Sequence, residues 1–250
     1  MSDKMEVYYF SPTGGTKKVS GIFVDAMEKE VIWHDLGSKK SMMEKPEGEM
    51  TVVASPVFGG RIPSVVREKI EKLSGTGKKA VTIAVYGNRA YEDALLEMND
   101  ILMKCGFTVI ASGAFVAQHS MAPEVGAGRP DGEDEKEIYK FAESVKNSTA
   151  TENVHVPGNR PYKPEMNMPV APISLLSCTK CGKCVTVCPT NAISVADGAV
   201  ITDTEKCILC MACTHVCTEQ ARIRPLPLQQ KTEQMLGALK GVRNKNEVFL

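Results

Sequence analysis

The sequence predicts a two-domain protein of the α/β class, in which a doubly wound, five-stranded parallel sheet is followed by a small cysteine-rich α+β domain. Strand-like and helix-like segments alternate over residues 5–146, the pattern of a parallel sheet covered by helices on both faces. Eight of the nine cysteines then fall between Cys178 and Cys217. A chain of 250 residues is long enough to bury the cores of two such domains.

Periodicity places the elements of the first domain. The expected strands are apolar runs at residues 7–10, 31–36, 51–55, 80–86 and 108–117. Apolar residues recur at helical spacing over residues 19–27, 65–73, 90–105 and 138–145. Gly75 and Gly106 are expected to end the second and third helices. The acidic run 131–137 is expected to begin the fourth, because negative charge is favourable at a helix N-terminus.

Composition limits the classes of partner. Hydrophobic residues make up 43% of the chain and charged residues 24%, as in ordinary globular proteins. The 30 basic and 30 acidic side chains balance, so no nucleic-acid partner is expected. Residues 1–150 carry 19 basic and 22 acidic side chains, and residues 151–250 carry 11 and 8. The N-terminal residues lack a secretory signal and no apolar run is long enough for a membrane span, so we expect a cytoplasmic protein without a membrane anchor.

A proline-rich segment separates the two predicted domains. Five of the chain's 14 prolines lie in residues 157–172, which is typical of a semi-rigid linker. The apolar residues Met235, Leu236 and Leu239 predict one short helix near the C-terminus, with no functional signal of its own. The expected organisation is a first domain at 1–148, a linker at 149–172, a second domain at 173–228 and a tail at 229–250.

The cysteines form two copies of one motif. The spacing C-x2-C-x2-C-x3-C-P starts at Cys178, and the cysteine spacing repeats 29 residues later from Cys207. This is the bacterial ferredoxin run, in which the fourth cysteine of each copy binds the cluster of the other copy. The motif predicts two [4Fe–4S] clusters. Cluster one would take Cys178, Cys181, Cys184 and Cys217, and cluster two would take Cys207, Cys210, Cys213 and Cys188.

Zinc and disulfides are the alternatives for this array. Zinc sites typically use two C-x2-C pairs separated by a longer loop, and disulfides are disfavoured in a reducing cytoplasm. The triplet-plus-one grouping favours clusters over both. Thr218 stands where the first copy has Pro189, which removes no ligand. His215 lies between two ligands but is not needed as one, and Cys105 is expected to be a packing residue. Residues 192–200 predict a hairpin with a glycine turn.

A loop rich in glycine and hydroxyl groups follows the first strand. Residues 11–16 read Ser-Pro-Thr-Gly-Gly-Thr and precede a helix, where free backbone N–H groups and the helix dipole favour an anion. The loop matches neither the Walker motif nor G-x-G-x-x-G. It resembles the FMN phosphate loop of the flavodoxins, so the first domain is expected to be flavodoxin-like.

Two further loops carry the same resemblance. Residues 55–63 and 86–93 leave the third and fourth strands at their carboxyl ends, beside the switch point where such sheets bind ligands. They look like the flavodoxin loops that hold the isoalloxazine ring, with aromatic faces and a Gly59–Gly60 backbone able to turn toward flavin N5. The structural alternative is that the glycines and hydroxyl groups of these three loops serve only to form tight turns. Gln118, His119 and Ser120 are weaker candidates. The residues assigned to FMN are Ser11, Thr13, Gly14, Gly15, Thr16, Pro56, Val57, Phe58, Gly59, Gly60, Tyr86, Gly87, Asn88, Tyr91 and Asp93.

The whole chain resembles the flavodoxin–ferredoxin fusion proteins of anaerobic bacteria and archaea. The resemblance implies an electron-transfer protein that passes single electrons between FMN and two [4Fe–4S] clusters, and on to redox proteins as donor and acceptor. The alternatives are a flavin-dependent reductase of a small molecule fed by its own clusters, and a redox sensor. No catalytic acid or base is visible, which favours the carrier. Flavodoxin-like domains of this kind sometimes pair, so a homodimer is open.

Overall fold

The computed structural model describes residues 4–40, 42–166 and 168–250. Its main sheet holds five parallel strands, β1 (Lys4–Tyr9), β2 (Glu30–Asp35), β3 (Met50–Pro56), β4 (Lys79–Tyr86) and β5 (Thr108–Val116). Their spatial order is 2-1-3-4-5, which is the flavodoxin-like order of a doubly wound sheet. The predicted fold class of the first domain is therefore confirmed.

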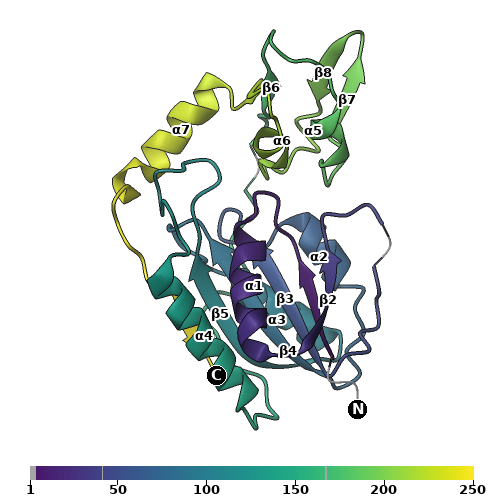
Figure 1. Cartoon of the computed structure of the whole chain (residues 1–250), viewed down its shortest axis with the longest axis vertical. Coiled ribbons are helices and arrows are strands. Elements are labelled where there is room, and N and C mark those ends of the chain that lie inside the picture. Colours follow the sequence, from purple (N-terminus) through teal and green to yellow (C-terminus); the bar gives the residue numbers. More distant parts are fainter. Residues whose placement is uncertain (1–3, 41, 167) are drawn as a thin grey trace.

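Helices cover both faces of this sheet (Figure 1). Helices α1 (Gly15–Met27) and α4 (Gly132–Lys146) lie on one face, and α2 (Ser64–Ile70) and α3 (Ala94–Lys104) on the other. Neighbouring strand residues alternate between the two cores: Val7 packs with α1 and α4, whereas Tyr8 packs with α2 and α3. Burial on both faces explains why the central strands read as continuous apolar runs.

Helix ends differ from the expectation in two places. Helix α2 ends at Ile70, before Gly75, and α3 begins at Ala94 instead of residue 90. The residues before α3 form a turn in which the Asp93 backbone N–H donates to the Gly60 carbonyl at 2.9 Å. The acidic start of α4 is confirmed, because Asp131 and Asp134 form a capping box there.

The small domain contains two short sheets. Strand β6 (Ile173–Ser174) pairs with β9 (Arg222–Ile223), and β7 (Ile193–Ala196) pairs with β8 (Ala199–Thr202) in the predicted hairpin. Asp197 and Gly198 at the hairpin turn both have positive φ, as a tight two-residue turn requires. Two single-turn helices, α5 (Lys183–Thr186) and α6 (Ala212–His215), follow the cysteine loops.

The linker does not run free between the domains. Asp93 accepts hydrogen bonds from the backbone N–H groups of Asn159 and Lys163 at 2.8 and 2.6 Å. Asp100 on α3 pairs with Arg160 and also accepts from the Tyr162 hydroxyl. These contacts fasten the linker to the first domain beside α3.

The C-terminal residues return to the first domain. Helix α7 (Leu226–Leu236) and a 3-10 turn, η1 (Gly237–Leu239), lead down from the small domain, as Figure 1 shows in yellow. Strand β10 (Glu247–Phe249) then pairs antiparallel with β5 and forms a sixth strand of the main sheet. The sequence predicted a short helix here but not this strand. Among the described residues, no helix is long and apolar enough to cross a membrane.

Buried polar groups hold this tail in place. The Asn88 side chain donates to the Val242 carbonyl at 2.7 Å, and Arg129 donates to the Asn244 carbonyl at 2.6 Å. The Arg129 guanidinium is in turn held by the carboxylate of Asp134, which is fully buried and also accepts from Asn246. The tail is thus docked on an internal ion pair.

We expect Asp134→Asn to destabilise the protein by about 3–5 kcal/mol, because the substitution leaves the Arg129 guanidinium buried without its counter-charge. The measurement is chemical denaturation at pH 7. Glu133→Gln is the matched control, since that side chain is 75% exposed, and it should change stability by less than about 0.5 kcal/mol. Equal stabilities of the two variants would contradict the role given to the ion pair.

The same carboxylate predicts a pH dependence. Burial alone would raise the pKa of Asp134, but hydrogen bonds from Arg129, the Asp131 backbone and Asn246 lower it below its usual value. A depressed pKa in the folded state stabilises the protein above the unfolded value of about 3.9, and this contribution is lost as pH falls through the folded value. We therefore expect the unfolding free energy of the wild type to fall more steeply than that of Asp134→Asn on acidification from about pH 5 to pH 2.

Candidate functional site

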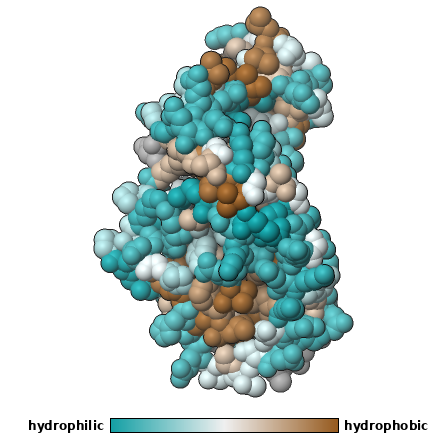
Figure 2. Space-filling model, turned by 90° about the vertical axis from the view of Figure 1, so that its left-hand side faces the viewer, coloured by the Kyte–Doolittle hydropathy of each residue, from teal (hydrophilic) through white to brown (hydrophobic). Residues whose placement is uncertain are grey.

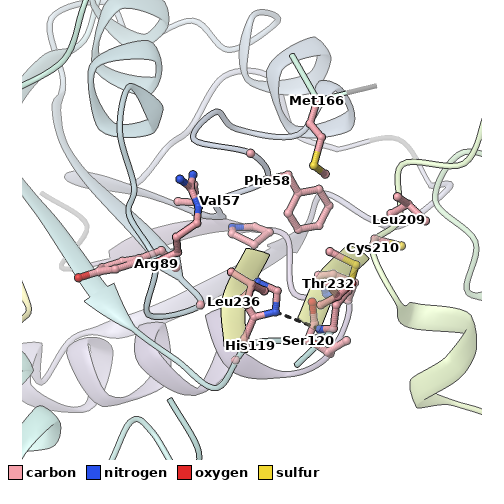
Figure 3. A pocket seen from close by; sticks show the side chains of 18 of the residues that line it. Val57, Phe58, Arg89, His119, Ser120, Met166, Leu209, Cys210, Thr232 and Leu236 are labelled. Carbon is pink, nitrogen blue, oxygen red and sulfur yellow. Dashed lines mark hydrogen bonds between the residues drawn. The ribbon is translucent and has the colours of Figure 1, made fainter. Parts of the chain in front are cut away.

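A cavity of about 340 Å³ lies at the carboxyl ends of the parallel strands. The loops after β1, β3, β4 and β5 all contribute to its wall, so it lies beside the switch point between β1 and β3. Figure 3 shows Phe58 and Val57 on one side of it and His119 and Ser120 on another. The structure thus brings the three predicted loops together around one cavity of ligand size.

Most of the residues assigned to FMN line this cavity. They are Ser11, Thr13, Gly15, Thr16, Pro56, Val57, Phe58, Gly59, Tyr86 and Gly87. The weaker candidates Gln118, His119 and Ser120 line it as well.

Five assigned residues lie outside the lining. Gly14 is the N-cap of α1, and the Gly60 carbonyl accepts from the Asp93 N–H. Asn88 is fully buried and bonds the tail, the Tyr91 hydroxyl donates to Glu247 of β10 at 2.7 Å, and Asp93 holds the linker. The last three side chains therefore secure the chain segments that surround the cavity.

The loop before α1 has the form of an anion site. Gly14 adopts a left-handed conformation with φ of 90°, and no side chain caps the helix. The Ser11 hydroxyl accepts from the Lys17 N–H at 2.9 Å, which folds the loop over the first turn. A Cβ on Gly15 would lie 3.2 Å from the Ala117 Cβ, so a larger side chain at this position would crowd Ala117. The loop fits a phosphate in donor chemistry and in space.

The opposite wall comes from segments that sequence reasoning did not connect with the site. Met166 and Met168 of the linker line the cavity, as do Lys231, Thr232 and Leu236 of α7. In Figure 3, Thr232 and Leu236 lie across from Phe58. Leu228 and Leu236 are apolar residues eight positions apart in α7, which places them on the same face two turns apart and was a signal that this face would be covered.

Cationic groups border the cavity, and one histidine in it is neutral. Arg89, Lys163 and Lys231 belong to the lining. Burial, together with the charges of Arg224 and Arg89, lowers the pKa of His119 to about 4, so its imidazole is uncharged at pH 7. The ring lies against Gly87, where a Cβ would approach the His119 Cδ2 to 2.4 Å. Glycine at position 87 is therefore required by this contact.

The cysteines gather around two smaller cavities in the small domain. One cavity is lined by Cys178, Cys181, Cys184 and Cys217. The other is lined by Cys188, Cys207, Cys210 and Cys213. The fold therefore assembles the crossed sets expected from the motif, with four thiols around each cavity. Among the described residues, no three His, Cys, Asp or Glu side chains converge as ligands of a single metal ion.

Backbone geometry shapes the two cysteine loops alike. Lys180 and Gly182 have positive φ in the first loop, and Leu209 and Met211 have positive φ at the equivalent positions of the second. Burial raises the pKa of the Cys210 thiol to about 12 and also raises the pKa values of Cys207 and Cys213. Free thiols at these positions are protonated at neutral pH, so metal binding there would release protons.

Two residues set aside as non-ligands lie away from these cavities. His215 is exposed at the end of α6 and lines neither cysteine cavity. Cys105 is half-buried against the core beneath α2 and α3, and its thiol donates to the Ile70 carbonyl at 3.5 Å. Both positions agree with the expectation.

The large cavity and one cysteine cavity share a wall. Leu209 and Cys210 line both, and Figure 3 shows them beside Thr232 and near Phe58. Cys210, which the cysteine motif assigns to cluster two, thus borders the space between the flavodoxin-like loops.

Comparisons with known proteins support the iron–sulfur interpretation. Two models of the family described as "4Fe-4S binding domain" match residues 171–194 and 204–220. An uncharacterized ferredoxin-like protein of Haemophilus influenzae is 35% identical over 65 residues, which are 24% of this chain and 76% of that protein. The polyferredoxin-like subunit of an aliphatic sulfonate oxidoreductase of Pyrococcus furiosus is 49% identical over 45 residues, 16% of this chain. This chain spans only 26% of that subunit.

Solved flavodoxins overlay on the first domain. A flavodoxin of Streptococcus pneumoniae TIGR4 has a TM-score of 0.45 and 17% identity, covering 56% of this chain and 95% of the flavodoxin. Flavodoxin 1 of Bacillus cereus gives 0.45 and 17%, covering 58% and 99%. The strand order 2-1-3-4-5 itself defines the flavodoxin-like fold of this domain.

The crossed cysteine sets can be tested by pairing substitutions. We expect Cys188→Ala/Cys210→Ala to remove two ligands of cluster two and leave cluster one complete, with about four iron atoms and one reducible cluster per chain. Cys188→Ala/Cys181→Ala removes one ligand from each set and should leave no complete [4Fe–4S] cluster. Iron and sulfide analysis with electron paramagnetic resonance of the reduced proteins distinguishes them. The reverse result would show that each motif binds its own cluster.

Proposed function

We propose that this chain, as a member of the flavodoxin–ferredoxin fusion family, transfers single electrons between FMN and two [4Fe–4S] clusters and passes them on to redox proteins. One observation supports this most strongly: Cys210 lines the cavity formed by the flavodoxin-like loops. A wall shared by the proposed flavin site and a proposed cluster ligand supports direct electron transfer between the two centres. FMN exchanges one or two electrons and each cluster exchanges one, so the pair links two-electron and one-electron chemistry.

The proposed division of the chain follows from this function. Residues 1–148 would bind FMN and residues 173–228 the clusters, with 149–172 and 229–250 as connecting segments. Phosphate would lie at the loop of residues 11–16, and the ring beside Phe58 and Gly59. The linker and tail supply the opposite wall of the cavity, which supports a role in holding the two domains in register.

The proposed order of the two clusters follows from which cluster borders the flavin cavity and which has an exposed cysteine ligand. Cluster two is the inner cluster in this proposal, because its ligand Cys210 borders the flavin cavity. Cluster one is the outer cluster, because its ligand Cys181 is exposed. Figure 2 shows apolar surface at the small-domain end of the molecule. The exposed apolar residues of this domain include Leu176, Val195 and Ile201. An external redox protein would dock at this end.

FMN binding can be separated from cluster binding with one matched pair of variants. We expect Gly15→Val to weaken FMN binding at least tenfold, because the new side chain meets Ala117 and fills the phosphate loop, while both clusters remain. Gly21→Val places the same side chain in the same helix, where a Cβ has no neighbour within 4 Å, and should keep FMN and clusters. The measurement is flavin, iron and sulfide content after anaerobic reconstitution.

Carrier and enzyme give different results with the reconstituted wild type. If the protein is a carrier, its reduced form should pass electrons to a ferredoxin-dependent acceptor protein. The Gly15→Val variant should then be unable to transfer electrons that enter at the flavin. Turnover confined to one small organic molecule would support the flavin-dependent reductase instead. Zinc in place of iron in the wild type would overturn both readings.

A further inference from the structure

The cysteines of the two halves of the small domain are related by a 29-residue repeat, and at one position that is buried in both halves the residues differ in charge. Cys188 is followed four and five residues later by Ala192 and Ile193. In the second half, Cys217 is followed at the same distances by Ala221 and Arg222. Arginine therefore stands where the repeat has isoleucine.

Both positions face the cysteine cavities. Ile193 lines the cavity of cluster two, and Arg222 lines the cavity of cluster one. Their exposures are also alike, at 6% for Ile193 and 4% for Arg222. A guanidinium thus occupies a place that the other half fills with an aliphatic side chain. Burying a charge is costly unless something compensates for it.

The protein compensates for this charge only in part. The Arg222 Nη1 donates to the Ser174 hydroxyl at 3.0 Å, and Nη2 donates to the Thr202 hydroxyl. Neither acceptor carries a charge. The Nε–H is buried, and among the described residues it has no hydrogen-bond partner. A buried donor without an acceptor points to a group that completes the site.

The charge of Arg222 reaches cysteines of both sets. Burial raises the pKa values of Cys184, Cys207 and Cys213, and the Arg222 charge acts against that rise at each of them. Cys184 belongs to cluster one, and Cys207 and Cys213 belong to cluster two. The geometry agrees, because Arg222 lines the cavity of cluster one and its strand β9 contacts α6, which carries Cys213 of the second set.

We infer that Arg222 is a fixed cation shared by the two clusters, which offsets the negative charge of their thiolates and raises both reduction potentials. This inference rests on the proposed function, because it requires both clusters to be present. Reduction adds one negative charge to a cluster, and a buried cation stabilises the reduced form more than the oxidised form. Arg222 acts as a positioning charge and is not itself a ligand.

The test replaces arginine by the residue that the repeat supplies. We expect Arg222→Ile to hold both clusters and to lower each reduction equilibrium constant at least tenfold, or about 59 mV for a one-electron couple. Arg222→Lys keeps the charge and should stay closer to the wild type. Lys206→Gln is the control. It removes a positive charge next to Cys207 in the sequence, but the Lys206 side chain is 62% exposed to solvent. The measurement is an anaerobic redox titration followed by electron paramagnetic resonance.

Each outcome decides the inference. If either cluster of Arg222→Ile keeps the wild-type reduction potential, the inference of a shared buried cation is overturned. It is also overturned if Lys206→Gln shifts the reduction potentials by the same amount as Arg222→Ile. If Arg222→Ile does not bind the clusters, the Arg222→Lys variant decides. Cluster binding in Arg222→Lys with reduction potentials near those of the wild type supports the role of the charge. Loss of the clusters in both variants overturns it. Iron and sulfide content of the wild type separately tests the proposed function.

Discussion

The contact between the second cysteine loop and the flavodoxin-like cavity is the constraint on which the rest of the structure depends. Leu209 and Cys210 lie in the wall of that cavity, so two domains with separate cores share one functional surface. Such a contact is small by itself. It persists only if the chain on both sides holds the domains in register, and the linker and the tail are placed to do so.

Buried carboxylates fasten both segments. Asp93 and Asp100 hold the linker, and Asp134 holds Arg129, which binds the tail. These groups are directional, and removing one partner leaves the other desolvated. The opposite net charges of the two halves give only a weak, salt-screened attraction by comparison. The specific hydrogen bonds therefore determine how the domains meet, while the overall charge contributes little.

Much of the architecture could be predicted from the sequence because it depends on local pattern. Apolar runs predicted the strands, Asp197–Gly198 the hairpin, and cysteine spacing the crossed sets that line the two cavities. Strand β10 escaped prediction because three residues carry no periodicity and are placed by distant partners such as Asn88 and Arg129. Asn88, Tyr91 and Asp93, which were assigned to FMN, bond the tail and the linker with their side chains. Polar groups that follow a strand look alike in a sequence whether they face a ligand or a returning chain.

The central claim, that electrons pass between the flavin cavity and cluster two before cluster one, can be tested by rapid reduction of bound FMN in two variants. Cys178→Ala/Cys217→Ala should lack cluster one, and Cys188→Ala/Cys210→Ala should lack cluster two. We predict fast transfer from the flavin to the remaining cluster in the first variant, at a rate independent of protein concentration. In the second variant the rate should be at least tenfold lower. Equal rates, or faster transfer without cluster two, would contradict the account.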